Sequence, residues 1–300
     1  ISRRAASGRA VSERVIQKEI KREGEEERRD SVGRNRKKIA LVTGASSGIG
    51  RCLARQTAEN YPELHEIWVL ARRKEELEAL QTECPETRFR LLVMDLADKE
   101  TFTELAGLLG AERPHICLLV NGAGLGHNGP TARLETSGLC DMIDVNCRAL
   151  IAVTRLCLPY MGRGSRILQL ASGSAFLPQP GFAVYAASKS CVLSFGRALR
   201  EELRPRGIVV TTVCPGPVDT DFFRAGGITL SPLKRFFLAD PEKVAKKALA
   251  DARKGKALSV YGLSMKMVRI AAKVFPEGWL VRFHVNQQDS SEKIVENAHC

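Results

Sequence analysis

Short apolar runs alternate with longer amphipathic stretches from Lys38 onward. Each run is four to seven residues long, and the stretch that follows is usually long enough for a helix. We expect strands at residues 39–43, 67–70, 89–94, 116–121, 165–171, 208–214 and 257–261. Short apolar strands that alternate with helices are typical of a parallel sheet covered on both faces. The pattern therefore predicts an α/β fold: a single domain with a doubly wound parallel sheet of about seven strands.

The chain on either side of this pattern is polar. Residues 1–38 contain 13 Lys/Arg and 7 Asp/Glu, so this segment carries about half of the net charge of +12. We expect residues 1–37 to be a charged, disordered tail. Their Arg and Ser content is also compatible with a cleaved transit peptide, although the acidic run 25–27 disfavours that interpretation. The predicted catalytic domain is 38–262, and residues 263–300 form a C-terminal extension with a polar tail.

The extension begins with an amphipathic pattern in residues 264–275. Lys266, Arg269 and Lys273 fall on one helical stripe, and the apolar residues lie largely elsewhere. A basic amphipathic helix can lie on an anionic membrane, but more often such a helix packs on its own domain, which is our expectation here. There is no apolar run of about 18 residues, so we expect no transmembrane helix. No aromatic-rich basic motif points to a nucleic-acid partner.

Nine cysteines and five histidines are scattered along the chain. No two cysteines have the Cys-x-x-Cys spacing, and the histidines do not cluster with them. We therefore expect no metal site and reduced thiols, as in a cytoplasmic protein.

A glycine-rich turn follows the first apolar run, in the segment Thr43-Gly-Ala-Ser-Ser-Gly-Ile-Gly50. Gly44 permits a tight turn, Gly48 lets the backbone approach a phosphate, and Gly50 lets the next helix pack close to the strand. The N-terminal amides of that helix would point at a pyrophosphate. Between a strand and a helix, this spacing is a strong indication of a dinucleotide site.

The second apolar run ends in Ala71-Arg72-Arg73-Lys74, without an acid at its tip. An acid there would accept a hydrogen bond from the ribose 2′-hydroxyl of NAD, whereas an arginine can grip the 2′-phosphate of NADP. We expect Arg72 to bind that phosphate, and Arg73 and Lys74 to pair with Glu75 and Glu76. The sequence therefore favours NADP(H) over NAD(H).

Tyr185 and Lys189 lie one helical turn apart, and Ser172 precedes the tyrosine by thirteen residues. A nearby ammonium stabilises a phenolate, so we expect Lys189 to lower the pKa of Tyr185 from about 10. Tyr185 would then be a general acid in reduction and a general base in oxidation. Ser172, favoured over Ser174, would stabilise the developing alkoxide.

Taken together, these motifs resemble the short-chain dehydrogenase/reductase family over residues 38–262. The resemblance implies a seven-stranded Rossmann-type fold, a nicotinamide cofactor, a small carbonyl or alcohol substrate, and a homodimer or homotetramer. Asn146 resembles the family's fourth catalytic residue, which would hold a water that relays protons to Lys189. The catalytic set is then Asn146, Ser172, Tyr185 and Lys189. The expected cofactor contacts are Gly44, Ser46, Ser47, Gly48, Ile49, Gly50, Arg72, Asp95, Asn121, Gly122, Tyr185, Lys189, Pro215, Gly216, Val218 and Thr220.

The resemblance also assigns roles within that set. Asp95 would contact the adenine amine and Asn121 would line the adenosine end, while Val218 and Thr220 would lie against the nicotinamide. The chain departs from the family at Gly122, where a second asparagine usually braces the sheet. We therefore expect a less rigid sheet at that point.

Residues 221–238 carry phenylalanines on both sides of a Gly226-Gly227 hinge and are expected to form a substrate lid. An apolar lid favours an apolar substrate, such as a steroid-like or acyl-chain ketone. The leading hypothesis is an NADP(H)-dependent carbonyl reductase or alcohol dehydrogenase of apolar compounds. A 3-oxoacyl-carrier-protein reductase, with Arg224, Lys234 and Arg235 as a basic patch, remains an alternative. A non-catalytic NADPH sensor or scaffold is the alternative from another class.

Overall fold

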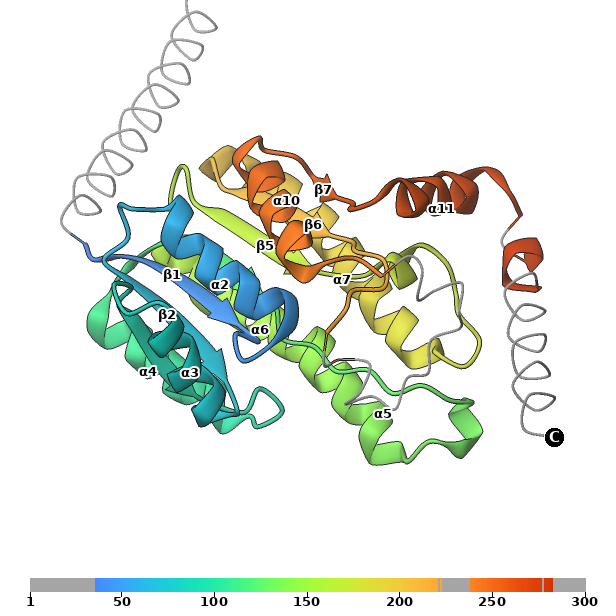
Figure 1. The fold of residues 1–300 in the computed structure, drawn as a ribbon, viewed down its shortest axis with the longest axis horizontal. Helices are drawn as coiled ribbons and strands as arrows, with labels where there is room; N and C mark the ends of the chain where they lie inside the picture. The colour runs from blue at the N-terminus through green and yellow to red at the C-terminus, as the bar shows by residue number, and fades with distance from the viewer. Residues whose placement is uncertain (1–35, 221, 223–237, 277, 283–300) are drawn as a thin grey trace, which may run out of the picture. The chain divides into compact units, whose positions relative to one another are not determined.

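The computed structural model of the protein describes residues 36–220, 222, 238–276 and 278–282, and within them seven parallel strands form one sheet (Figure 1). The sheet order is β3-β2-β1-β4-β5-β6-β7. The strands are β1 (Lys38–Thr43), β2 (Glu66–Ala71), β3 (Phe89–Val93), β4 (His115–Asn121), β5 (Arg166–Leu170), β6 (Val209–Val213) and β7 (Leu258–Ser259). The predicted doubly wound sheet is confirmed.

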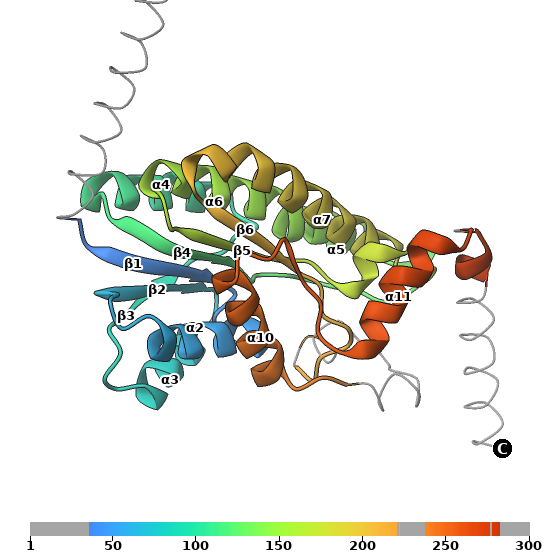
Figure 2. The ribbon, with the colours of Figure 1, turned by 90° about the horizontal axis from the view of Figure 1, so that it is seen from above.

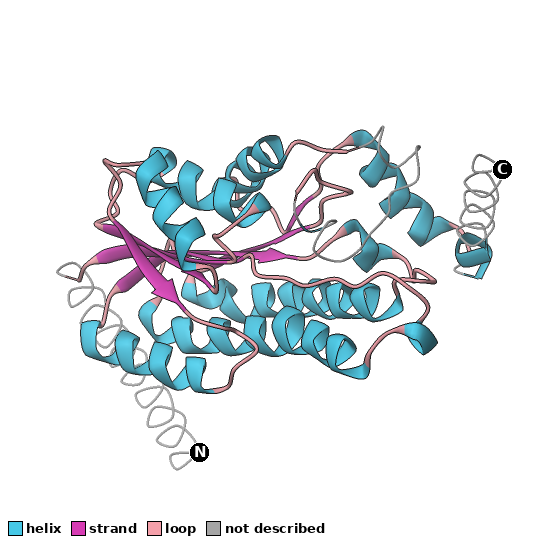
Figure 3. Cartoon of the chain, turned by 60° about the horizontal axis from the view of Figure 1, so that its bottom comes forward, coloured by secondary structure: helices cyan, strands magenta, loops and turns pink. Residues whose placement is uncertain are grey.

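Helices cover both faces of this sheet. Figure 2 shows α2, α3 and α10 on one side and α4, α6 and α7 on the other, and Figure 3 shows the same layers around the strands. The helices are α2 (Gly48–Asn60), α3 (Lys74–Glu83), α4 (Glu100–Glu112), α5 (Thr136–Ile143), α6 (Leu150–Cys157), α7 (Ala183–Leu203), α10 (Pro241–Arg253) and α11 (Leu263–Val274). A π-helical turn, η2 (Asp144–Ala149), joins α5 to α6. Single 3-10 turns are η1 (Thr131–Arg133), η3 (Leu158–Tyr160), η4 (Gly173–Phe176) and η5 (Arg204–Arg206).

The central strand β1 shows why the sequence folds in this way. Its side chains alternate between the faces, so Ala40 and Val42 join the core under α2 and α10, while Ile39 and Leu41 join the core under α4 and α6. All four side chains are fully buried. A strand buried on both faces is apolar at successive positions, which explains the uninterrupted apolar run in the sequence.

The strand order reverses between β1 and β4, which are neighbours in the sheet. Loops leave such a switch point in opposite directions, so a crevice opens beyond the carboxyl ends of the strands. β1, β4 and β5 therefore deliver the glycine turn, the Asn121 segment and Ser172 to one end of the sheet.

The strand boundaries differ from the expected ones by a few residues. The largest difference is at β7, where only Leu258–Ser259 pair with β6, instead of the expected 257–261. An edge strand has one neighbour, so fewer of its residues enter the ladder.

The chain divides into two compact units, Ile1–Lys37 and Lys38–Cys300. The expected tail and most of the lid, residues 221 and 223–237, lie outside the described residues.

Candidate active site

The glycine turn between β1 and α2 is shaped by contacts that leave no room for side chains. Gly44 has φ +71°, and a Cβ there would lie 2.6 Å from the Ala123 nitrogen. At Gly50, a Cβ would lie 2.2 Å from the Gly44 carbonyl oxygen. Glycine is therefore required at both positions, and the turn brings α2 close to β1.

The N-terminus of α2, which follows this turn directly, has no side-chain cap. Ser47 is the N-cap residue, but its side chain makes no capping hydrogen bond, and the first turn contains no acid. Gly48 has φ +56°, and its missing Cβ faces the Thr220 methyl at 3.0 Å. The structure thus brings the glycine turn and Thr220, far apart in sequence, to one place.

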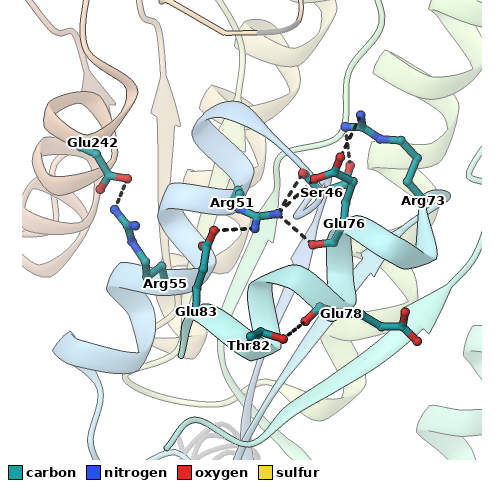
Figure 4. Close-up of polar contacts among 9 residues, drawn as sticks. All are labelled: Ser46, Arg51, Arg55, Arg73, Glu76, Glu78, Thr82, Glu83 and Glu242. Atoms are coloured by element: carbon teal, nitrogen blue, oxygen red, sulfur yellow. Dashed lines mark hydrogen bonds and ion pairs between the residues drawn. The ribbon is translucent and has the colours of Figure 1, made fainter. Parts of the chain in front are cut away.

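Two arginines at the end of β2 lie beside this turn. Arg72 Nη1 lies 4.0 Å from Asp95 Oδ2, and both side chains are exposed. Arg73 Nη2 donates to Ser46 Oγ at 3.3 Å, and its Nη1 lies 3.8 Å from Glu76 (Figure 4). The expected pairing of Arg73 with Glu76 is therefore present, but Arg73 also reaches the glycine turn.

A third arginine, Arg51 of α2, links the glycine turn to α3. Arg51 Nη1 donates to the Ser46 carbonyl oxygen at 3.3 Å and to the Glu76 carbonyl oxygen at 2.8 Å (Figure 4). Its Nη2 donates to Glu83 Oε1 at 2.9 Å. Because Arg51 ties the turn to α3, the position of Ser46 is fixed relative to the arginines at the end of β2. Lys74 pairs with Glu78 at 3.4 Å, not with Glu75 or Glu76 as expected.

Asn121 lies at the end of β4, with its side chain inside the sheet layer. Its Nδ2 donates to Thr154 Oγ1 and to Gln169 Oε1, both at 2.9 Å, and the residue is only 2% exposed. The side chain therefore braces β4 against β5 and α6, and a cofactor contact would fall to its backbone. A Cβ at Gly122 would lie 2.6 Å from the Thr43 oxygen, so this backbone admits only glycine there. The bracing that we expected to be missing at Gly122 is thus supplied by Asn121.

Ser172, Tyr185 and Lys189 come together at the end of β5. Ser172 Oγ accepts from the Ser174 amide at 3.1 Å, and its hydroxyl lies close enough to the Tyr185 phenol to lower the pKa of that group. Lys189 Nζ donates to the Leu170 carbonyl oxygen at 3.0 Å and lies 5.6 Å from the centre of the Tyr185 ring.

The competing serine is engaged elsewhere. Ser174 Oγ donates to Gln179 Oε1 at 3.0 Å. Ser172, which lies beside Tyr185, therefore stays our prediction for the catalytic serine.

Asn146 occupies the π-helical turn η2 and is fully buried. Its Oδ1 accepts from the Leu125 amide at 2.8 Å, and its Nδ2 donates to the Leu125 carbonyl at 2.9 Å and to Ser188 Oγ at 2.9 Å. A Cβ at Gly124 would lie 3.3 Å from Asn146 Oδ1 and 3.2 Å from Lys189 Nζ. The amide oxygen and the ammonium therefore line one small space beside Gly124.

The Tyr185 ring is held between two phenylalanines. Phe182 stacks on it with ring centres 4.3 Å apart, and Phe222 is tilted against it at 5.4 Å. Phe222 also reaches Gly126, where a Cβ would lie 2.3 Å from its ring. Of the expected lid, Phe222 and Leu238 are described, and Phe222 lies directly against the tyrosine.

The loop after β6 approaches the same residues. The Gly173 amide donates to the Pro215 carbonyl at 2.7 Å, so this loop is tied to the turn that follows Ser172. Val218 is 5% exposed, and its neighbours Pro217 and Asp219 exchange backbone hydrogen bonds with Ala239. The expected contacts Pro215, Gly216, Val218 and Thr220 therefore extend from Ser172 to the glycine turn.

A family model described as short chain dehydrogenase matches residues 38–227. The chain belongs to this family. It is 34% identical over 211 residues to the NADP-dependent 3-hydroxy acid dehydrogenase YdfG of Salmonella typhi, over 69% of this chain and 80% of that protein. It is 32% identical over 186 residues to the very-long-chain 3-oxoacyl-CoA reductase of Homo sapiens, over 59% of this chain and 58% of that protein.

Solved structures agree with this assignment. A short chain dehydrogenase from Burkholderia cenocepacia in complex with NADP is 26% identical, with a TM-score of 0.62 over 75% of this chain and 95% of that chain. The protein is therefore an oxidoreductase that acts on CH–OH groups.

The protonation states in this enzyme are governed by burial. Burial raises the pKa of Tyr185 to about 12, and the neighbouring Ser172 hydroxyl opposes this only in part. Burial also lowers the pKa of Lys189 to about 8. The expected lowering of the tyrosine pKa by Lys189 is therefore not found, because desolvation of the phenolate dominates the shift.

The thiols of Cys147 and Cys214 lie near the ammonium of Lys189 but give it no counter-charge. Burial raises the pKa of each thiol to about 12, so both are neutral at pH 7.

The residues at the glycine turn fit a dinucleotide. The uncapped N-terminus of α2 and the absence of acid in its first turn leave a cradle for a pyrophosphate. The arginines at the end of β2 extend this cradle with positive charge. A metal site is not indicated, because residues 36–220, 222, 238–276 and 278–282 contain no cluster of three or more His, Cys, Asp or Glu side chains.

Sequence reasoning missed several residues that shape this site. Phe182 and Ser188 lie three residues before and after Tyr185, and helical spacing could have placed both near it. Met265 of α11 had no such signal. A Cβ at Gly173 would lie 2.2 Å from its Cε, and one at Gly216 would lie 2.8 Å from its Cγ. Met265 thus packs onto two bare glycines beside Ser172.

Proposed function

We propose that this dehydrogenase interconverts an apolar ketone or aldehyde and the corresponding alcohol, with NADP(H) preferred over NAD(H). The observation that carries the proposal is the Tyr185 phenol, which lies beside the Ser172 hydroxyl while its ring lies between Phe182 and Phe222. This arrangement joins a proton donor to an apolar wall. The phosphate cradle opens at the same end of the sheet.

In the reductive direction, Tyr185 donates its proton to the carbonyl oxygen of the substrate. The raised pKa of Tyr185, about 12, keeps the phenol protonated at neutral pH, which is the form a general acid needs. Ser172 donates a hydrogen bond to the same oxygen and stabilises the negative charge that develops there. NADPH, when bound, supplies the hydride that reduces the carbonyl carbon.

In the oxidative direction, Tyr185 must accept the alcohol proton, so its phenolate has to be stabilised. The ammonium of Lys189 lies 5.6 Å from the centre of the Tyr185 ring and would stabilise the phenolate. Its pKa of about 8 leaves it mostly protonated at pH 7. The positive nicotinamide ring of NADP⁺ would add to that stabilisation. We assign to Asn146 a water held in the space beside Gly124, through which Lys189 exchanges protons with solvent.

The preference for NADP(H) is argued from the end of β2. Arg72 is exposed, and its ion pair with Asp95, at 4.0 Å, is long and screened by solvent, so a phosphate can compete for the guanidinium. A planar guanidinium can bind the 2′-phosphate with two hydrogen bonds. The YdfG relative is described as NADP-dependent, which supports the same choice.

The substrate class is argued from the wall around Tyr185. Phe182 and Phe222 present apolar surface at the reacting oxygen, and each buried ring contributes about 1.5–3 kcal/mol to binding. A 3-oxoacyl chain also meets this requirement, and the human relative is named a 3-oxoacyl-CoA reductase. The carrier-protein alternative needs Arg224, Lys234 and Arg235, which lie outside the described residues. A homodimer or homotetramer in the cytoplasm remains our prediction.

The proposal is tested by the oxidation of NADPH and NADH in the presence of graded ketones. We expect consumption of NADPH with bulky apolar ketones or 3-oxoacyl thioesters, and at least about tenfold lower kcat/KM with NADH or with acetone. A preference for sugars or small hydroxy acids would contradict the assigned substrate class. An equal rate with both cofactors would contradict the role of Arg72.

A further inference from the structure

The helix α11 carries an apolar stripe that faces away from the domain. Leu263, Met267, Ile270 and Val274 are spaced by four, three and four residues, which aligns them on one helical face. They are 75%, 59%, 55% and 70% exposed. Four large apolar side chains in a row on the surface indicate an interaction site rather than scattered exposure.

The opposite side of α11 makes the contacts with the domain. Met265 packs on Gly173 and Gly216, and α11 contacts η4. Figures 1 and 2 show α11 beyond β7, apart from the helices that cover the sheet. Our sequence expectation, that this helix packs its apolar side on its own domain, is therefore wrong for these four residues.

Positive charge runs beside the stripe. Lys266 and Lys273 are exposed and lie on the helix next to the apolar face. Residues 263–282 contain four Lys/Arg and one Asp/Glu, for a net charge of four minus one, +3. Phe275 and Trp279 follow the helix and are 52% and 74% exposed. Apolar residues flanked by lysines, with a tryptophan at one end, are typical of helices in a membrane interface.

We propose that α11 binds the surface of an anionic phospholipid bilayer, with its axis in the headgroup plane. The apolar stripe would enter the acyl boundary, and Lys266 and Lys273 would contact the acidic headgroups. In the part of the chain that the structure describes, no helix is long and apolar enough to cross a bilayer. α11 itself, with twelve residues, is too short to span the bilayer, so its own contact is peripheral.

A second copy of the chain fits the stripe less well. Twelve helical residues span about 18 Å, which is short for a stable dimer interface of about 800 Å² per partner. A twofold pairing of two stripes would also bring their lysines close together. An anionic bilayer instead neutralises these charges.

Membrane binding is tested by flotation of the full chain with vesicles, an assay that does not depend on turnover or on the proposed function. We compare vesicles of phosphatidylcholine alone with vesicles that contain about 30% phosphatidylglycerol. We expect at least about tenfold stronger partitioning onto the anionic vesicles, and a decrease at high salt.

Two variant pairs assign the binding to α11. Met267→Ser with Ile270→Ser should lower partitioning by at least about tenfold, whereas Ile143→Ser with Ile151→Ser on α5 and α6 should not. Ile143 and Ile151 are matched controls because they are 42% and 39% exposed. Circular dichroism shows whether each variant is folded.

The charge is tested in the same way, with variants of equal net charge. Lys266→Glu with Lys273→Glu should abolish the preference for anionic vesicles, while the change of the exposed Lys243 and Lys246 of α10 to Glu should leave most of it. Equal loss in both would mean that overall charge, not α11, binds the vesicles, and would overturn the proposal. So would a lack of vesicle binding, or sedimentation that shows self-association abolished by Met267→Ser with Ile270→Ser.

Discussion

The cofactor end and the catalytic end of this enzyme lie at the same edge of one sheet, but they are built differently. Around the glycine turn, the close approach of backbone segments at Gly44 and Gly50 forms the site. The charged side chains of Arg72 and Asp95 beside it are 63% and 45% exposed. At the catalytic end, Tyr185, Lys189 and Asn146 are 8%, 4% and 0% exposed. Solvent screens charge at the first end, whereas burial sets the protonation of Tyr185 and Lys189 at the second.

This difference teaches where substitutions should have large effects. A buried polar group has few alternatives to its native partner, so its loss changes chemistry or stability strongly. An exposed arginine competes with water, so its loss changes affinity by a smaller factor. The predictions below test this contrast in order of decreasing effect.

Tyr185→Phe removes the proton donor but keeps the ring between Phe182 and Phe222. We expect kcat to fall by about a thousandfold or more, while NADPH affinity, followed by fluorescence titration, changes little. Tyr61→Phe is the matched control, because Tyr61 is a buried core tyrosine at 4% exposure and should retain full turnover. If Tyr185→Phe kept its turnover, another group would have to supply the proton, and the catalytic end would lose its defining residue.

Much of the fold and of the catalytic set could be predicted from the sequence, because both depend on local patterns. Strands buried on both faces leave uninterrupted apolar runs, and Tyr185 and Lys189 share a helix, so spacing alone places them together. Contacts between distant segments leave no such trace. The approach of Met265 to Gly173, and the contact of Ser46 with Arg73, depend on how loops from different strands meet.

The protonation states of Tyr185 and Lys189 could not be predicted from the sequence either. Spacing shows that Lys189 is near Tyr185, but it does not show how deeply both are buried. Burial moves the pKa of Tyr185 up and that of Lys189 down, against the effect expected from their proximity. Similarly, the amphipathic pattern of residues 264–275 was visible in the sequence, but the direction of its apolar side relative to the domain was not.

Lys189 should make the stability of the cofactor-free enzyme depend on pH. Its pKa is about 8 in the folded chain, below the ordinary lysine value of 10.5 that applies to the unfolded chain. The unfolded chain therefore binds more protons between these values, and stability rises with pH across that window. Lys189→Met removes this dependence. The stability of the variant relative to wild type should be higher at pH 7 than near pH 10, by up to about 3 kcal/mol, while the lost hydrogen bond to the Leu170 carbonyl lowers both values alike.

Urea unfolding at both pH values measures this difference. Lys243→Met, at an exposed position of α10, is the control and should give the same small difference at pH 7 and pH 10. Tyr185 acts in the opposite direction, but only above pH 10, and it is present in all three proteins. A difference for Lys189→Met that stayed constant with pH would show that burial does not perturb the lysine, and the contrast between the two ends would weaken.

Phe222→Ala tests the apolar wall, which is intermediate between the two ends because Phe222 is only half-buried. We expect kcat/KM for a bulky apolar ketone to fall by about tenfold, and that for acetone to change little, because only the larger substrate reaches the ring. Phe275→Ala, an exposed phenylalanine after α11, should leave both values unchanged. Equal losses for both ketones, accompanied by a lower Tm, would instead make Phe222 a packing residue.

Arg72→Ala should have the smallest effect, since this side chain is largely exposed and its interaction with the 2′-phosphate is screened. We expect KM for NADPH to rise by about five- to tenfold, and KM for NADH to change by less than about twofold, because NADH has no 2′-phosphate. Arg88→Ala removes an exposed arginine at the opposite end of β3 and controls for the loss of one positive charge. If Arg72→Ala raised both constants equally, Arg72 would support the cofactor site in general rather than select NADP(H). The contact between Arg73 and Ser46 would then make Arg73→Ala the next variant to measure, with the same pair of cofactors.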